Sequence, residues 1–252
     1  MYVKEKFQAG EKAIGTLMRV IRNPSVALFA KNAGLDFMLF DCEHSNYTIE
    51  NLNDIFMMCN AVGVEGFLRV PSGTSDYISR ALDAGASGVM VPMVESAEYA
   101  KEIVKWSKYP PLGKRGFTSN NAHTGYQPLK HLDIMETGNN RVVTIAQIET
   151  GLGVQNADAI AAVEGIDVLV VGQNDLSVAM GVPGQITGDL VMDSIQKVIN
   201  ACKKNGKIFG LGADVAYLRN FKEDTGMILI GSDVVFLNQA FNDIATRFEA
   251  LK

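Results

Sequence analysis

The amino-acid sequence predicts an α/β fold, a single-domain (β/α)8 (TIM) barrel spanning residues 1–252. Short runs rich in β-branched and aliphatic residues alternate along the whole chain with amphipathic stretches, which is typical of parallel strands joined by helices. No linker interrupts the alternation, and eight strand candidates can be counted. Eight right-handed strand–helix units close naturally into a barrel, and barrels of about 250 residues form one domain. A doubly wound open sheet would show the same alternation, so only the count favours closure.

The strand candidates are residues 13–20, 37–43, 66–70, 88–93, 142–149, 168–172, 207–213 and 227–231. Helical patterns lie between them. One covers residues 48–62, where Thr48 can cap the N-terminus. Another covers residues 96–109, whose apolar residues recur at three- and four-residue spacing.

The last segment, residues 232–252, is predicted to be a helix that begins at Ser232. Its apolar positions continue with a period near 3.6, at Val235, Phe241, Ile244, Ala245 and Phe248. The run VVFLN inside it would, taken alone, also fit a strand.

One connection, residues 109–141, is far longer than a usual crossover loop. Long polar loops on such scaffolds commonly cover a site, so we expect this one to do the same. We also expect His123, which lies within it, to be solvated.

Composition excludes several classes of protein. With 47% hydrophobic and 20% charged residues, the chain can bury a substantial core. No apolar run approaches the roughly 18 residues of a membrane span, and the first residues lack the apolar core of a secretory signal. We therefore expect a cytoplasmic protein with no membrane partner. A net charge of -5 and the lack of a basic run make nucleic acid a poor partner.

The three cysteines, Cys42, Cys59 and Cys202, are far apart and show no CxxC spacing. This pattern predicts neither a disulfide framework nor a thiolate zinc site, and it favours reduced core residues.

Polar residues follow several of the predicted strands, at the point where each strand ends. His44 follows strand 37–43, Arg69 lies near the end of 66–70, Glu149 ends 142–149, and Asp175 comes three residues after 168–172. In a barrel the carboxyl ends of all strands face one mouth. These four side chains should therefore converge.

Glu149 and Asp175 would be two carboxylates from neighbouring strands. Together they could offset the charge of a divalent cation and leave coordination sites for water and substrate. All-oxygen ligation favours magnesium or manganese. The alternative is that Glu149 caps the following helix or pairs with a lysine.

His44 follows Asp41 and Glu43, and a neutral imidazole whose tautomer is set by a carboxylate could act as a general base. The alternative is a histidine hydrogen-bonded at a helix start. Arg69 must find an anion near the end of its apolar strand. That anion is either a substrate oxygen or a neighbouring acid such as Asp41.

Several blocks, taken together and in order, resemble the HpcH/HpaI aldolase family of class II pyruvate aldolases, from about residue 12 to the C-terminus. The blocks are FDCEHS (40–45), LRVP (68–71), ALDAGASGVMVPMVESAEYA (81–100), YPPLGKRG (109–116), QIETGLGVQN (147–156), VEGIDVLVVGQNDLSVAMG (163–181) and KIFGLG (207–212). The resemblance implies a lyase that reversibly cleaves 4-hydroxy-2-oxo acids, including 2-keto-3-deoxy acids, to pyruvate and an aldehyde.

The resemblance also implies roles for particular residues. Glu149 and Asp175 would hold a divalent cation (Mg²⁺ or Mn²⁺, or else Co²⁺) that pyruvate chelates through its carboxylate and keto oxygens. Arg69 would support the negative oxygen that develops in the reaction. His44 would transfer a proton. A nearby aspartate, either Asp83 or Asp41, would raise its basicity.

Further implied substrate contacts are Gln147 and the backbone at Gly172 and Asn174. By the same analogy the protein is a homo-oligomer, a trimer or a hexamer, in which C-terminal helices are exchanged between neighbouring subunits. No lysine in the matched blocks stands out as a Schiff-base nucleophile, which favours metal catalysis.

The sequence departs from the family pattern at Cys42, in GQND (172–175), and in the loop FTSNNAHTGY (117–126). These changes put the identity of the aldehyde in doubt. The altered GQND and loop segments also leave open a non-catalytic pyruvate-binding relative. The alternative among enzymes is a lyase for acyl-CoA thioesters, similar to citrate lyase β or malyl-CoA relatives.

Overall fold

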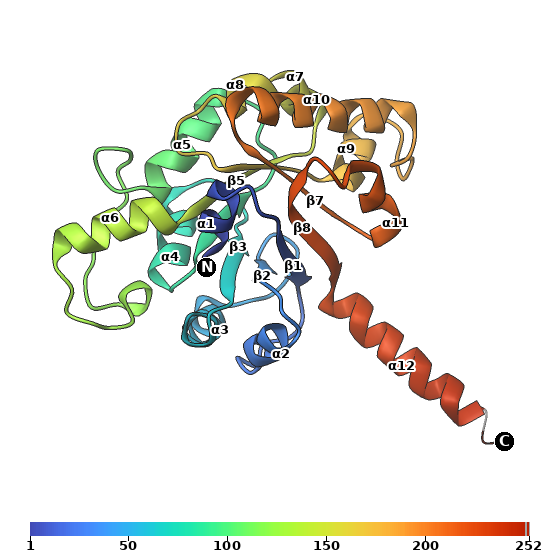
Figure 1. Ribbon diagram of the computed structural model, residues 1–252, viewed down its shortest axis with the longest axis horizontal. Coiled ribbons are helices and arrows are strands. Elements are labelled where there is room, and N and C mark those ends of the chain that lie inside the picture. The colour runs from blue at the N-terminus through green and yellow to red at the C-terminus, as the bar shows by residue number, and fades with distance from the viewer. Residues whose placement is uncertain (250, 252) are drawn as a thin grey trace.

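The computed structural model describes residues 1–249 and 251, and it confirms the predicted barrel. Eight parallel strands pair in chain order, and β8 returns to β1 to close the sheet (Figure 1). The strands are β1 Ala13–Met18, β2 Phe37–Asp41, β3 Glu65–Arg69, β4 Gly88–Val91, β5 Val143–Ile148, β6 Val168–Val171, β7 Ile208–Ala213 and β8 Thr225–Ser232. Each lies at a predicted position, with ends that differ by a few residues.

The helices surround this sheet (Figure 1). They are α1 Val3–Gln8, α2 Val26–Asn32, α3 Ile49–Val62, α4 Ser75–Asp83, α5 Ala97–Ser107, α6 His131–Arg141, α7 Gly151–Gln155, α8 Ala157–Ala161, α9 Gln173–Ala179, α10 Asp189–Asn205, α11 Val215–Leu218 and α12 Asp233–Glu249, with 3-10 turns at η1 Ala122–Thr124 and η2 Arg219–Phe221. The predicted cap is present, because the Thr48 hydroxyl accepts a hydrogen bond from the Asn51 N–H. Within the described chain, no helix combines the length and apolar character needed to cross a membrane.

The barrel interior is filled by side chains rather than open. Phe37 of β2 stacks on Phe67 of β3 with ring centroids 5.1 Å apart. Val3 and Phe7 of α1 pack into the same apolar cluster, so α1 closes the end where the strands begin. A ligand can therefore enter only at the opposite end, where the strands finish.

The long connection between β4 and β5 does not cover the mouth, which corrects the expectation for residues 109–141. It follows α5, and a segment that leads from a helix into the next strand lies at the amino ends of the strands. Arg115 in this connection pairs with Asp83 at the end of α4, at 2.7 Å. No residue of the connection lines the mouth cavity.

The C-terminal helix α12 leaves the barrel and projects away from it (Figure 1). Helix was predicted for 232–252. The structure has it over Asp233–Glu249 and a turn at residue 251, while residues 250 and 252 lie outside the described part. The Ser232 hydroxyl accepts a long hydrogen bond of 3.4 Å from the Val235 N–H. Most of the apolar side chains of α12 are exposed.

Candidate active site

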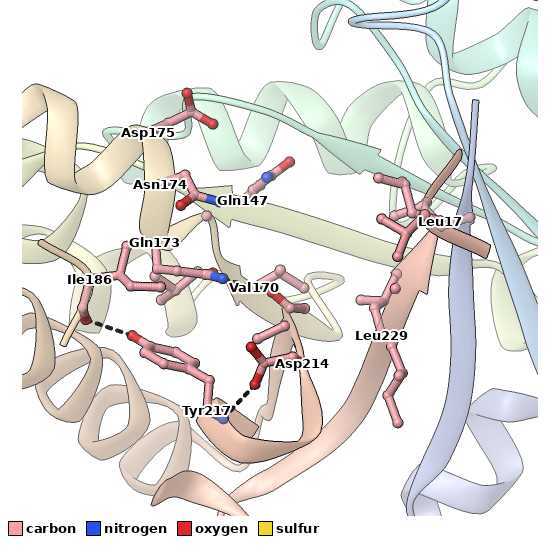
Figure 2. A pocket seen from close by; sticks show the side chains of 18 of the residues that line it. Leu17, Gln147, Val170, Gln173, Asn174, Asp175, Ile186, Asp214, Tyr217 and Leu229 are labelled. Atoms are coloured by element: carbon pink, nitrogen blue, oxygen red, sulfur yellow. Dashed lines mark hydrogen bonds between the residues drawn. The ribbon is translucent and has the colours of Figure 1, made fainter. Parts of the chain in front are cut away.

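A cavity of about 970 Å³ opens at the carboxyl ends of the strands. Predicted site residues His44, Arg69, Gln147, Asn174 and Asp175 line it. Figure 2 shows Gln147, Asn174 and Asp175 together on one side of this space, which is the side formed by β5 and the start of α9. His44, Arg69 and Asp175, three of the four side chains expected to converge, thus border one cavity, whereas Glu149 is not among the residues that line it.

Asp41, at the end of β2, is fully buried and organises the side of the mouth formed by β2 and β3. Its two carboxylate oxygens accept hydrogen bonds from Nε (3.0 Å) and Nη2 (2.8 Å) of Arg69. The pairing register sets Asp41 opposite Arg69 in neighbouring strands, which brings the two groups together. Burial alone would raise the pKa of Asp41, but Arg69 holds this pKa below its usual value. Asp41 is therefore the anion that Arg69 was predicted to need.

His44 lies at the rim with half of its side chain exposed. Its ring Nε2 is 3.7 Å from a carboxylate oxygen of Glu43, which also pairs with Nη1 of Arg69 at 3.0 Å. Asp41 accepts from the backbone N–H of His44 and does not meet the ring. The role expected for Asp41 therefore needs correction, because Arg69 occupies its carboxylate on the strand side and leaves Glu43 as the acid beside the imidazole.

Glu149, at the end of β5, is nearly fully buried. It accepts hydrogen bonds from Nε2 of Gln147 (2.8 Å) and from the backbone N–H of Met93 (3.0 Å). Met93 itself adopts a left-handed conformation, with φ 55°, which is uncommon for a residue other than glycine. Thr150, not Glu149, caps α7 by accepting from the Gly153 N–H. Glu149 therefore does not cap the helix that follows it, which was one alternative to a role in metal binding.

Burial, together with the nearby carboxylates of Glu43 and Asp175, raises the pKa of Glu149 to about 7. A buried carboxylate whose pKa is raised next to other acids is a group that a cation would stabilise in its charged form. Asp175 lies in the first turn of α9, is exposed, and borders the cavity. Its side chain lies beside that of Asn174 (Figure 2).

Gly172 lies directly against the side chains of Glu149 and Gln147, and they leave no room for a side chain at this position. A Cβ at this position would lie 2.5 Å from Oε1 of Glu149 and 3.0 Å from Nε2 of Gln147. The Gly172 N–H donates to the carbonyl of Ile148 at 3.1 Å, and the expected contact between the backbone at Gly172 and Asn174 and the substrate stays a prediction. The structural role of Gly172 is to leave space for the carboxylate of Glu149.

The donor set fits a hard divalent cation that takes most of its ligands from elsewhere. Among the described residues, no three His, Cys, Asp or Glu side chains are placed to share an ion. Glu149 and Asp175 would provide two carboxylates, and the buried Oε1 of Gln147 has no hydrogen-bond partner in residues 1–249 and 251. Oxygen ligands of this kind suit Mg²⁺ or Mn²⁺, and the remaining coordination positions would fall to water and substrate.

Asp83 does not join this site within the chain. It ends α4, at the amino side of the barrel, where it pairs with Arg115. A helix that follows a strand runs back across the barrel, so its last residue is far from the mouth. His123 packs in the same region, with both ring nitrogens buried and unpartnered among the described residues. It is therefore not the solvated loop histidine that was expected.

Sequence reasoning missed Arg19 and the backbone of Met93. Arg19 follows β1 and lines the cavity, and its Nε donates to Asp41 at 3.2 Å. The signal that identified Arg69, a guanidinium at the end of an apolar strand, was also present here. No comparable sequence pattern predicts the left-handed torsion angle of Met93.

Comparison with known proteins agrees with this geometry. The family model for HpcH/HpaI aldolase/citrate lyase matches residues 20–238. A hydroxypyruvate/pyruvate aldolase of Pseudomonas aeruginosa is 32% identical, covering 98% of this chain and 92% of its own length. A 4-hydroxy-4-methyl-2-oxoglutarate aldolase of Chaetomium globosum is 35% identical, with 79% and 74% covered.

Among solved structures, an HpcH/HpaI aldolase from Desulfitobacterium hafniense superimposes with a TM-score of 0.94 at 32% identity, covering 99% of this chain and 97% of that one. Similarity of this extent, over nearly the whole of both chains, indicates that the two proteins belong to one family. The chain therefore belongs to the HpcH/HpaI aldolase/citrate lyase family, and it is a carbon–carbon lyase of the aldolase type.

Proposed function

We propose that this enzyme is a divalent-metal-dependent aldolase that reversibly cleaves 4-hydroxy-2-oxo acids to pyruvate and an aldehyde. The observation that carries the proposal is the buried carboxylate of Glu149, whose raised pKa reflects burial and the neighbouring acids, Asp175 among them. Mg²⁺ or Mn²⁺, with Co²⁺ as a further candidate, would neutralise this pair. Bound between Glu149 and Asp175, the ion would polarise the 2-oxo group of the substrate.

The chain's own residues account for the remaining chemistry. In the cleavage direction the C4 hydroxyl loses its proton, the C3–C4 bond breaks, and the bonding electrons form the enolate of pyruvate. Arg69 is held rigidly by Asp41 and Glu43, so its outward N–H groups can stabilise the negative oxygen without reorganising. His44, which is half-exposed and borders the cavity, would take the hydroxyl proton.

Proton exchange at the pyruvate methyl group tests this function without knowledge of the aldehyde. We would incubate the purified protein with pyruvate in deuterated buffer, with and without Mg²⁺ or Mn²⁺, and follow the methyl signal by NMR. Metal-dependent exchange is expected, and it should be lost in Glu149→Gln. The matched control is Glu98→Gln, which removes an exposed acid on α5. Lack of exchange, together with no cleavage of any 2-keto-3-deoxy acid, would refute the proposal, and cleavage confined to CoA thioesters would favour an acyl-CoA lyase.

We further propose that the enzyme is a cytoplasmic homo-oligomer, a trimer or a hexamer, in which α12 is exchanged between neighbours. Leu237, Phe241, Ile244 and Phe248 recur along one face of α12 and are between 38% and 63% exposed. A contiguous apolar face of this kind indicates an interaction surface. The three free cysteines are consistent with a reducing compartment.

A further inference from the structure

Arg19 is a second arginine at the mouth, and contacts from two sides fix its position. The backbone N–H groups of Arg19, Val20 and Ile21 donate to the carboxylate of Asp233 at 2.9, 2.8 and 2.9 Å. The Nε of Arg19 donates to Asp41. Asp233 is 3% exposed and Asp41 is fully buried, so both anchors are rigid parts of the barrel. The guanidinium is therefore held in place.

The far end of this guanidinium remains available. Throughout residues 1–249 and 251, no atom accepts a hydrogen bond from Nη1 or Nη2 of Arg19, and 37% of the side chain is exposed. Arg69 differs, because its side chain is 9% exposed and pairs with both Asp41 and Glu43. The two N–H groups that Arg19 presents to the cavity match the geometry of a carboxylate.

Arg19 shares its counter-ion with Arg69. The single negative charge of Asp41 pairs with both arginines, and within the described part of the chain the one further acid paired with either of them is Glu43, which contacts Arg69. Glu149 and Asp175 lie across the barrel, after β5 and β6, whereas Arg19 follows β1. The two arginines and the two acids therefore balance in charge, but Arg69 takes most of the ion-pair contacts and leaves the outer nitrogens of Arg19 to the cavity.

We propose that Arg19 binds a carboxylate on the carbonyl partner of pyruvate, so that the substrates of this enzyme are 4-hydroxy-2-oxo diacids. The inference rests on the proposed function. With the pyruvate half at β5 and β6, a substrate that spans the mouth passes His44 and Arg69 and reaches β1 with its other end. The bond that breaks is still C3–C4, and the second product is an aldehyde or keto acid whose carboxylate takes no part in the reaction. Arg19 is thus a specificity-determining residue.

Condensation of pyruvate with two small aldehydes tests this role. Glyoxylate carries a carboxylate, and glycolaldehyde, with the same number of carbons, carries a neutral hydroxymethyl group. We would measure kcat/KM for both aldehydes and compare their ratio between proteins, so that differences in aldehyde hydration cancel. The wild-type protein should favour glyoxylate, and Arg19→Gln should lower the ratio by roughly 10- to 100-fold. Arg19→Lys should retain part of the preference.

The matched control is Arg22→Gln, which removes the same charge from an exposed side chain in the same loop, outside the cavity. It should leave the ratio unchanged. An unchanged ratio in Arg19→Gln would overturn the inference. So would a wild-type protein that uses glycolaldehyde as well as glyoxylate, and this result needs no variant to fold.

The same assays separate this inference from the proposed function. If the wild-type protein neither exchanges the protons of pyruvate nor condenses it with either aldehyde, the aldolase proposal itself fails. If exchange and condensation with glycolaldehyde proceed but glyoxylate has no advantage, only the role of Arg19 is wrong.

Discussion

The carboxylate of Asp41 and the guanidinium of Arg69 form a buried, two-point pair between the ends of β2 and β3. Parallel hydrogen bonds to both oxygens give such a pair a defined orientation as well as attraction. The pair places a fixed positive charge at the mouth without leaving a buried charge uncompensated.

Replacement of Asp41 by Asn should therefore damage both folding and catalysis. The substitution leaves the Arg69 guanidinium, which is 9% exposed, without its main counter-charge. We expect the free energy of unfolding to fall by about 3 kcal/mol, because breaking a buried pair from one side leaves an unpaired charge. Urea unfolding measures this loss. Asp54→Asn, an exposed position on α3, is the control that should unfold like the wild-type protein.

Addition of one methyl group at Gly172 should inactivate the enzyme without unfolding it. The new Cβ would meet Glu149 at 2.5 Å and displace its carboxylate. A misplacement of about 1 Å at a reacting site commonly costs on the order of 100-fold in rate. We expect Gly172→Ala to lose about this much kcat/KM while its melting temperature stays within a few degrees of wild type.

Gly151→Ala is the matched control for this change. A Cβ at Gly151 meets no atom within 4 Å, and the residue lies in the first turn of α7. Its kinetics should equal those of the wild-type protein. Equal activity in both alanine variants would contradict the role assigned to Gly172.

Glu65 should make the stability of the protein depend on pH. It is buried at the start of β3 and accepts from the Val3 N–H, and burial raises its pKa to about 7 from the ordinary 4.5. Between these two values the unfolded chain loses the proton while the folded chain keeps it. This group's contribution to stability is therefore complete below about pH 4.5, and it declines as the pH rises to 7.

Glu65→Gln removes this titration and keeps an oxygen for the Val3 N–H. Relative to wild type, the variant should gain up to about 3 kcal/mol as the pH rises from 4.5 to 8. Denaturant unfolding at several pH values measures the difference. Glu11→Gln, an exposed position, should show no such trend, and a parallel course for Glu65→Gln and wild type would contradict the assignment.

A charge on the apolar face of α12 should dissociate the proposed oligomer. Phe241, 63% exposed, lies in the middle of that face, and Asn242 is the next residue along the helix. Light scattering coupled to size exclusion should give a trimer or hexamer for wild type and for Asn242→Asp. Phe241→Asp should yield smaller species. A wild-type monomer would refute the oligomer proposal.

Local patterns in the sequence determined the eight strands, because a strand buried on both faces must be apolar over its whole length. They also determined that Arg69, Glu149 and Asp175 lie at or just beyond strand ends, since this depends only on where each apolar run stops. The predicted end of β4 was less accurate. Residues 88–93 were predicted, but the strand stops at Val91, before the left-handed Met93.

Tertiary structure alone decided which of these side chains meet. Asp41 binds the guanidinium of Arg69 rather than the imidazole of His44, because strand register sets Asp41 and Arg69 opposite each other. Arg19 enters the site because closure brings β8, and with it Asp233, beside β1. Contacts between segments distant in the sequence depend on strand register and barrel closure. The local period of hydrophobic residues predicts neither of these properties.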